Sequence, residues 1–183
     1  MSGAGTASGA DPFAGALGRI RSPRPRIVLV DGAAGSGKST LAERIAHAIP
    51  RAQLLALDDL YPGWDGLDAA ARTVADDVLR PYRRGGRPRY RRWDWTLAAH
   101  AETRVLDRTR PLVVEGCGSF GAGAAALADL RVWVETRDHE RRRRLHERDG
   151  DAFGPFWPLW EAQFARYAGR ERPRTAADLV VRT

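Results

Sequence analysis

Three residue types are scarce in this 183-residue sequence, which contains one cysteine, one lysine and no asparagine. The lone Cys117 cannot form an internal disulfide, and no spacing of cysteine and histidine suggests a zinc site. No stretch approaches the ~20 consecutive apolar residues of a membrane span. The N-terminus has no basic segment followed by an apolar run, so it does not resemble a secretory signal. We therefore expect a cytoplasmic protein without a membrane partner.

The remaining composition is typical of a single globular domain. Hydrophobic residues make up 43% and charged residues 29% of the chain, which are ordinary values, and the length suits one domain. We expect residues 1–24, rich in glycine, alanine and serine, to form a flexible tail, and residues 25–183 to form the domain. The formal net charge of +7 fits either nucleic acid or small phosphorylated ligands as partners.

The hydrophobic pattern predicts strands that alternate with helices. Short apolar runs predict strands at 26–32, 52–59, 111–116, 131–136 and 177–181. Helical spacing predicts helices at 39–49, 68–83, 97–108, 123–130, 137–150 and 155–169, with a loop over 83–95. This alternation indicates a parallel sheet covered on both faces. Ligands bind beyond the carboxyl ends of such strands, so we expect Gly32, Asp58 and Glu115 to lie close together.

Residues 32–39 fit the phosphate-loop pattern G-x-x-x-x-G-K-[ST]. Such a loop curls its backbone N–H groups around a diphosphate, and side chains would obstruct that approach. We expect the nucleotide to contact Gly32, Ala33, Ala34, Gly35, Ser36, Gly37, Lys38, Ser39 and Thr40. Lys38 would reach the β and γ phosphates as a compact charge, where a planar guanidinium would not fit. Ser39 would ligate Mg²⁺ and Thr40 would contact the α-phosphate. The pattern thus predicts ATP and Mg²⁺ as cofactors.

Several classes of phosphate-loop protein do not fit this chain. A GTPase of the common type reads guanine with Asn-Lys-x-Asp, but the chain has no asparagine and its only lysine is in the loop. A motor or unwinding ATPase would need more chain and further motifs. A small phosphotransferase remains.

Five stretches together resemble the uridine kinase-like family of P-loop kinases: "DGAAGSGKST", "LDDLY", "RRWDW", "VVEG" and an arginine-rich helix ending "RDG". The match runs from about Arg26 to Val181. The resemblance implies an α/β fold, the P-loop NTPase three-layer α/β/α sandwich with a five-stranded parallel sheet and a short arginine-rich lid at about 138–153. It also implies an ATP- and Mg²⁺-dependent enzyme that phosphorylates a hydroxyl of a small metabolite, nucleoside-like (uridine or cytidine).

The same resemblance implies roles for acidic residues after two strands. Asp58 would accept the proton of the attacking hydroxyl, with Asp59 beside it and Tyr61 completing the pattern, although a helix cap or turn is the alternative for both acids. Glu115 would order Mg²⁺ directly or through water, as a carboxylate at a strand end can. The alternative for Glu115 is an N-cap or a salt-bridge partner.

The basic helix resembles the lid of these kinases. Arg144 and Arg148 would stabilise charge in the transition state, with Arg141 and Arg143 as further candidates. The alternative is a solvated basic face, which would explain at least half of these arginines.

Aromatic and acidic residues resemble the family's acceptor pocket. Trp93 would stack on the base, Asp94 would hold the pocket or the ribose, and Asp65 would bind ribose hydroxyls. The alternative is that Trp64, Trp93 and Trp95 only pack in the core.

Two other functions remain open from the residues alone. The arginines of "RRGGRPRYRR" could clamp an acceptor phosphate, as in a nucleoside monophosphate kinase acting on CMP. The basic, aromatic stretches could instead bind single-stranded nucleic acid. We expect a small-molecule acceptor, no nucleic-acid partner, and a monomer or homodimer.

Overall fold

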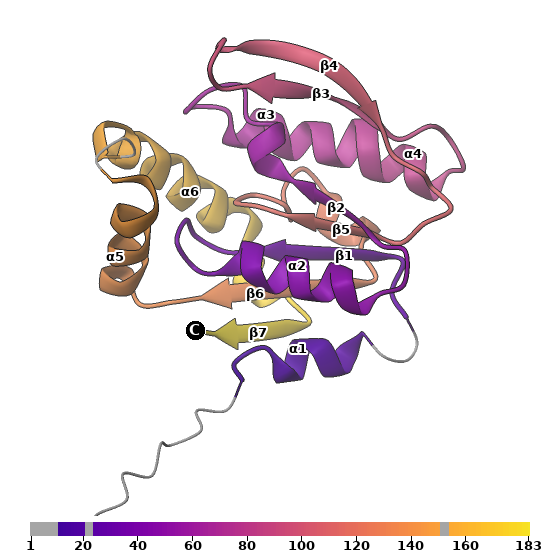
Figure 1. Cartoon of the computed structure of the whole chain (residues 1–183), viewed down its shortest axis with the longest axis horizontal. Helices are drawn as coiled ribbons and strands as arrows, with labels where there is room; N and C mark the ends of the chain where they lie inside the picture. The colour runs from indigo at the N-terminus through magenta and orange to yellow at the C-terminus, as the bar shows by residue number, and fades with distance from the viewer. Residues whose placement is uncertain (1–10, 21–23, 151–153) are drawn as a thin grey trace, which may run out of the picture.

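The computed structural model describes residues 11–20, 24–150 and 154–183 (Figure 1). Its centre is a five-stranded sheet with the strand order β2-β5-β1-β6-β7 and parallel pairing throughout. The strands are β1 (Ile27–Asp31), β2 (Gln53–Ala56), β5 (Leu112–Glu115), β6 (Leu130–Glu135) and β7 (Leu179–Arg182). The predicted fold class is confirmed.

Helices cover both faces of this sheet because alternate residues of a strand point to opposite sides. Val28 and Val30 of β1 pack on the side of α1 (Ala14–Arg19) and α2 (Lys38–Ala48). Ile27 and Leu29 pack on the opposite side. That side is covered by α3 (Leu67–Thr73), π-helical η2 (Val74–Leu79), α4 (Arg80–Arg83) and α6 (Trp157–Glu171). Burial on both faces explains why β1 is a continuous apolar run.

In the described part of the chain, five further helical elements, four of them short, lie between those named so far. They are η1 (Leu57–Asp59), η3 (Ala124–Leu127), α5 (Asp138–Asp149), η4 (Gly154–Phe156) and α7 (Pro173–Ala176). The predicted helices at 39–49, 68–83, 137–150 and 155–169 correspond to α2, α3–η2–α4, α5 and α6. Within the described residues, no helix is both long and apolar enough to cross a membrane.

The prediction of a loop over 83–95 and a helix over 97–108 is wrong. This region forms an antiparallel hairpin of β3 (Arg89–Asp94) and β4 (Ala99–Val105), which lies over α3 and α4 (Figure 1). The Asp94 carboxylate accepts hydrogen bonds from the backbone N–H groups of Thr96 and Leu97, both at 3.0 Å, and so stabilises the turn. Alanine, glutamate and arginine favour a helix over this stretch. However, the residues of β4 are largely exposed and lack the apolar stripe with which a helix would pack against the domain.

The prediction of a flexible tail is wrong for residues 11–20. Phe13, Ala16 and Ile20 are buried against α2 and β7, which makes α1 part of the domain. Asp11 accepts two hydrogen bonds from the Arg44 guanidinium of α2, at 2.9 and 2.6 Å. Ala16 and Ile20 follow Phe13 by three and seven positions, which is helical spacing, but glycine and alanine dilute the hydrophobic pattern. Residues 1–10 and 21–23 of the predicted tail lie outside the described residues.

Replacing Phe13 by alanine tests whether α1 stabilises the domain. Removing this buried ring should lower the free energy of unfolding by about 3 kcal/mol, measured by urea denaturation. Gly15→Ala is the control, because no atom lies within 4 Å of a methyl group there, and it should raise stability by up to about 1 kcal/mol. An unchanged denaturation midpoint for Phe13→Ala would mean that residues 11–20 do not pack on the domain.

Candidate functional site

The phosphate loop connects β1 to α2, and the backbones of β6 and α5 pack against it. A Cβ atom on Gly32 would lie 2.3 Å from the carbonyl oxygen of Val134, and one on Gly35 would lie 2.5 Å from that of Arg141. Gly35 also has a φ of +78°, which side chains disfavour. Gly32 of the motif and Gly35 within the loop thus allow β6 and α5 to approach the loop closely, and they leave the other side of the loop open to an anion.

A buried carboxylate lies at the start of this loop. Asp31 is fully buried and accepts hydrogen bonds from the backbone N–H groups of Gly32 (2.6 Å), Gly118 (3.1 Å) and Phe120 (3.0 Å). The hydroxyl of Tyr167 on α6 donates to it at 2.6 Å. Burial raises the pKa of Asp31 and these hydrogen bonds oppose that change. Asp31 therefore joins the phosphate loop, the loop after β5 and α6.

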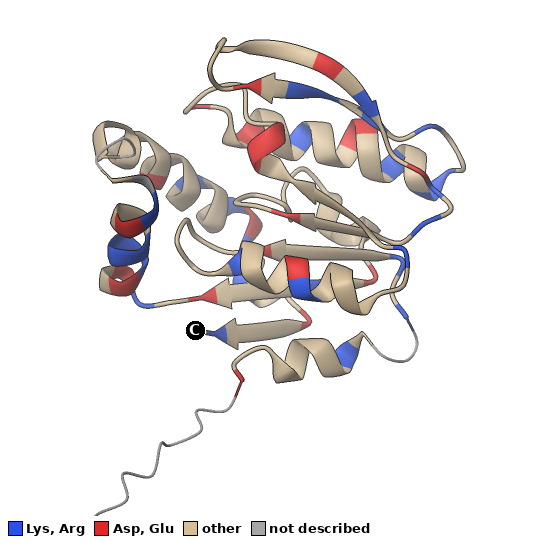
Figure 2. Ribbon diagram, in the orientation of Figure 1, with Lys and Arg blue, Asp and Glu red and all other residues tan. Residues whose placement is uncertain are grey.

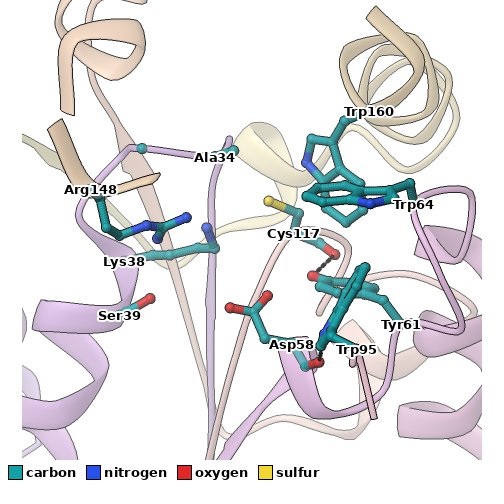
Figure 3. Close-up of a pocket in the computed structure, with 11 residues that line it drawn as sticks. Ala34, Lys38, Ser39, Asp58, Tyr61, Trp64, Trp95, Cys117, Arg148 and Trp160 are labelled. Carbon is teal, nitrogen blue, oxygen red and sulfur yellow. Dashed lines mark hydrogen bonds between the residues drawn. The ribbon is translucent and has the colours of Figure 1, made fainter. Parts of the chain in front are cut away.

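Lys38 extends from the first turn of α2 into a cavity of about 440 Å³ (Figure 3). Burial lowers the pKa of Lys38, whereas the nearby acidic groups raise it, and the net change is upward. In order of their effect on this pKa, these groups are Cys117, Glu115, Asp58 and Asp31. The ammonium group is therefore charged at neutral pH. A compact charge at the end of the loop can neutralise phosphate oxygens.

Glu115 and Ser39 have the chemistry of a Mg²⁺ site. Glu115, at the end of β5, is 5% exposed, and its Oε2 atom is buried without a hydrogen-bond partner among the described residues. Burial raises the pKa of Glu115, while Lys38 and a hydrogen bond with Ser39 oppose that change. A carboxylate with one unsatisfied oxygen beside a hydroxyl fits a hard cation that prefers oxygen ligands.

Asp58 lines the same cavity from η1, directly after β2 (Figure 3). Its carboxylate points toward the side on which Lys38 lies. The backbone carbonyl of Asp58 accepts a hydrogen bond from the indole nitrogen of Trp95 at 2.9 Å. The turn after β3 thus contacts η1, and Asp58 is anchored by a residue from a separate sheet.

Aromatic side chains form the wall of the cavity opposite Lys38 (Figure 3). Tyr61 is buried and its hydroxyl donates to the carbonyl of Cys117 at 2.9 Å. The rings of Trp64, Trp95 and Trp160 complete this wall. Burial raises the pKa of the Cys117 thiol to about 11, so the thiol is neutral and packs as a small apolar group.

The four candidate lid arginines lie in different surroundings. Arg143 is exposed and pairs with Glu140 and Glu147 of its own helix. Arg141 is 6% exposed and donates to the carbonyl of Ala34 in the phosphate loop at 3.0 Å. It also pairs with Asp138 and with Glu161 of α6. Arg148 lines the cavity beside Lys38 (Figure 3).

Arg144 does not line this cavity among the residues described. It pairs with Glu140 at 2.8 Å and donates to the Thr183 hydroxyl at 3.1 Å. The expectation that Arg144 acts with Arg148 on the transferring phosphate therefore finds no support in its position. Residues 151–153 of the expected lid lie outside the described residues.

Arg144 instead lines a second cavity of about 850 Å³, together with Thr136, Arg137, His139 and Thr183 among others. The hydroxyls of Thr136 and Thr183 both donate to the carbonyl of Ser36 in the phosphate loop, at 3.1 and 3.0 Å. The loop therefore separates the two cavities.

Several expected acceptor residues are not brought to the first cavity. Asp59 pairs with Arg104 of β4 at 2.9 Å, and Asp65 is exposed. Trp93 packs edge-on against His100 within the hairpin, and Asp94 is occupied by its turn and by Arg92. Tyr61 does line the cavity.

Sequence reasoning missed the wall formed by Trp64, Trp95 and Trp160. Trp95 lies two positions beyond Trp93, and the pairing register shifts between Arg91 and Trp93, which no local pattern reveals. Trp64 and Trp160 are distant in sequence, and only the packing of α6 brings them within 6.4 Å of each other.

Tyr167→Phe should weaken the anchoring of the phosphate loop. The variant loses one hydrogen bond to a buried carboxylate, which should lower the free energy of unfolding by about 2 kcal/mol, measured by urea denaturation. Tyr61→Phe is the matched control, because its buried hydroxyl donates to a neutral carbonyl, that of Cys117, and should cost about 1 kcal/mol. Equal losses in both variants would contradict a special role for Asp31.

Comparison with known proteins agrees with this geometry. A family model described as an AAA ATPase domain matches residues 11–173, and no curated protein is significantly similar in sequence. A possible uridine kinase from Bacillus stearothermophilus has a similar structure, with a TM-score of 0.66 and 17% identity over 93% of this chain and 97% of that one. A putative fructose transport system kinase from Silicibacter sp. TM1040 has a TM-score of 0.51 and 20% identity over 94% and 99%.

These likenesses confirm the expected resemblance at the level of the fold. The phosphate loop at residues 32–39 connects the central strand to a helix, as the motif requires. The chain therefore belongs to the AAA ATPase domain family and has a P-loop kinase-like fold.

Proposed function

We propose that the protein is an ATP- and Mg²⁺-dependent phosphotransferase that transfers the γ-phosphate of ATP to a hydroxyl of a small molecule. The observation that carries this proposal is that Asp58 lines one cavity with Lys38 and Ser39 of the phosphate loop. A protein that only binds or hydrolyses a nucleotide does not need a pocket for a second organic molecule beside Asp58. Here aromatic side chains continue the cavity beyond Asp58, which supports an acceptor.

The phosphates of ATP would lie on the loop. Backbone N–H groups at the start of α2 favour anions, and Lys38 neutralises the terminal phosphates. Arg148 lines the cavity beside Lys38 and would stabilise negative charge on the transferring group. The nucleoside half of ATP would occupy the second cavity, which lies on the side of the phosphate loop where the carbonyl of Ser36 accepts a hydrogen bond from Thr136.

Glu115 and Ser39 would hold Mg²⁺. The ion supplies positive charge that neutralises the phosphate oxygens. The unsatisfied Oε2 atom of Glu115 supports this assignment. Lys38 lies among the same carboxylates and offsets their mutual repulsion.

Asp58 would orient the acceptor hydroxyl and accept its proton as the oxygen attacks the γ-phosphorus. The new O–P bond forms while the bond to the bridging oxygen of ADP breaks, and the proton moves to the carboxylate. Positioning and charge supply most of the acceleration in this chemistry. The bond from Trp95 to the carbonyl of Asp58 would help to hold the carboxylate in line.

The alternatives have less support. A nucleoside monophosphate kinase needs cations on the acceptor side, but the described residues that form the aromatic wall include no arginine. Binding of nucleic acid would require available hairpin arginines, whereas two of them, Arg92 and Arg104, pair with Glu102. Acidic residues lie on both sides of the run of four arginines in α5 (Figure 2). The nucleoside acceptor implied by resemblance rested on Asp65, Trp93 and Asp94, which do not line the cavity.

Asp58→Asn should preserve ATP affinity while lowering kcat by about 100-fold or more, because the acceptor loses its base. ADP release over a panel of alcohols measures turnover, and calorimetry measures ATP binding. Asp59→Asn is the matched control. Its carboxylate pairs with Arg104 outside the cavity, so kcat should stay within a few-fold of the parent. Unchanged turnover in Asp58→Asn would exclude Asp58 as the base.

Glu115→Gln should raise the Mg²⁺ concentration needed for half-maximal activity by about tenfold, because an amide is a poorer ligand than a carboxylate. Titration of ADP release with Mg²⁺ at fixed ATP measures the change. Saturating Mg²⁺ should restore much of the activity. The same Mg²⁺ dependence in parent and variant would remove Glu115 from the ion site.

A further inference from the structure

The rings of the aromatic wall lie in different planes and do not form a flat slot. The rings of Trp64 and Trp95 lie 5.0 Å apart at 56°, and those of Trp64 and Trp160 lie 6.4 Å apart at 88°. Tyr61 meets Trp160 at 83°. A nucleobase held between two rings needs both of them nearly parallel to it. Rings in steeply different planes fit a compact group with contacts on several sides.

This wall also offers little to read the edge of a nucleobase. The hydroxyl of Tyr61 donates to Cys117, and the indole nitrogen of Trp95 donates to Asp58. Gln163 is buried nearby, but its amide donates to the carbonyl of Trp64 at 2.7 Å and accepts from the backbone N–H of Leu67 at 3.4 Å. These three groups are therefore engaged within the protein. The indole N–H of Trp160 is buried without a partner among the described residues, and one donor alone does not read the edge of a base, which presents both donors and acceptors.

The charge distribution across the cavity is asymmetric. Lys38 and Arg148 lie on the phosphate side, opposite the indole rings (Figure 3). The wall contains no cation among the described lining residues, and the carboxylate of Asp58 lies between the two sides. Several indole faces around one space attract a cation through their ring quadrupoles, most strongly when water is excluded. The ring of Phe156 stacks on that of Trp64, with the centroids 4.5 Å apart and the planes at 5°. This contact holds the Trp64 ring in place.

Resting on the kinase function proposed above, we propose that the acceptor is an alcohol bearing a compact ammonium group, which binds among Trp64, Trp95 and Trp160. The hydroxyl then lies at Asp58, and its oxygen bonds to the γ-phosphorus as ADP leaves and the proton passes to Asp58. The product is a phosphate monoester that keeps its ammonium group.

Binding of a cation without a hydroxyl tests the aromatic site independently of catalysis. Calorimetry on the full chain compares tetramethylammonium chloride with tert-butanol, an uncharged molecule of similar shape, at constant ionic strength. The ammonium ion should bind about tenfold more tightly. Equal binding of the two probes, or no binding of the cation, would overturn the proposal while leaving the kinase function standing.

Trp64→Leu locates the binding site. This variant should weaken tetramethylammonium binding about fivefold or more. Trp93→Leu is the matched control, because Trp93 does not line the cavity, and its affinity should equal that of the parent. Thermal unfolding checks that both variants fold. If either does not, the comparison of the two probes on the parent protein still decides the proposal. If both variants fold and lose the same affinity for tetramethylammonium, the assignment of the binding site to Trp64 is overturned.

Turnover tests the substrate class. ADP release should show a kcat/KM for choline about tenfold above that for its uncharged isostere 3,3-dimethylbutan-1-ol, and above that for uridine. A preference for the isostere or for uridine would overturn the ammonium proposal alone. If tetramethylammonium binds but no alcohol in the panel releases ADP above the ATP-only rate, the kinase function fails, and the acceptor proposal that rests on it fails as well.

Discussion

The buried carboxylate of Asp31 is the interaction on which the site depends. It receives three backbone N–H groups and the hydroxyl of Tyr167. A buried charge is tolerated only when it is this well hydrogen-bonded. These bonds place the phosphate loop, the loop that follows Glu115 and helix α6 in one fixed arrangement. Because α6 also carries Trp160, the same carboxylate connects the phosphate-binding end of the cavity to its aromatic end.

The sequence predicted well those features that local residue patterns determine. The phosphate loop requires glycine where neighbouring backbone atoms lie against it, as at Gly32, and such a requirement is visible as a motif. The order of strands and helices followed from apolar runs that are buried on both faces. Glu115 ends β5 and Asp58 lies two residues beyond the end of β2, so the parallel topology alone brings them to one edge of the sheet.

Features set by contacts between distant segments were not predictable in the same way. The sequence pattern predicts a loop and a helix where the hairpin of β3 and β4 lies, because the exposed strand β4 carries helix-forming residues and the turn depends on one aspartate. That error misplaced the aromatic side chains as well. Trp93 was expected in the pocket, whereas the turn brings Trp95 there. Likewise α1 was hidden by a composition typical of tails, although Phe13 and Ile20 are buried.

Arg141 has a consequence for how the cavity can open. Its guanidinium is enclosed between the carbonyl of Ala34 and Glu161, and the α5 backbone at this residue lies against Gly35. Swinging the whole helix outward would leave that cation and its partners unsatisfied, at a cost of a few kcal/mol. The first turns of α5 therefore belong to the rigid floor of the nucleotide site. If α5 bends to admit reactants, the bend therefore lies beyond Arg141. Arg148 would then move with the C-terminal part of the helix.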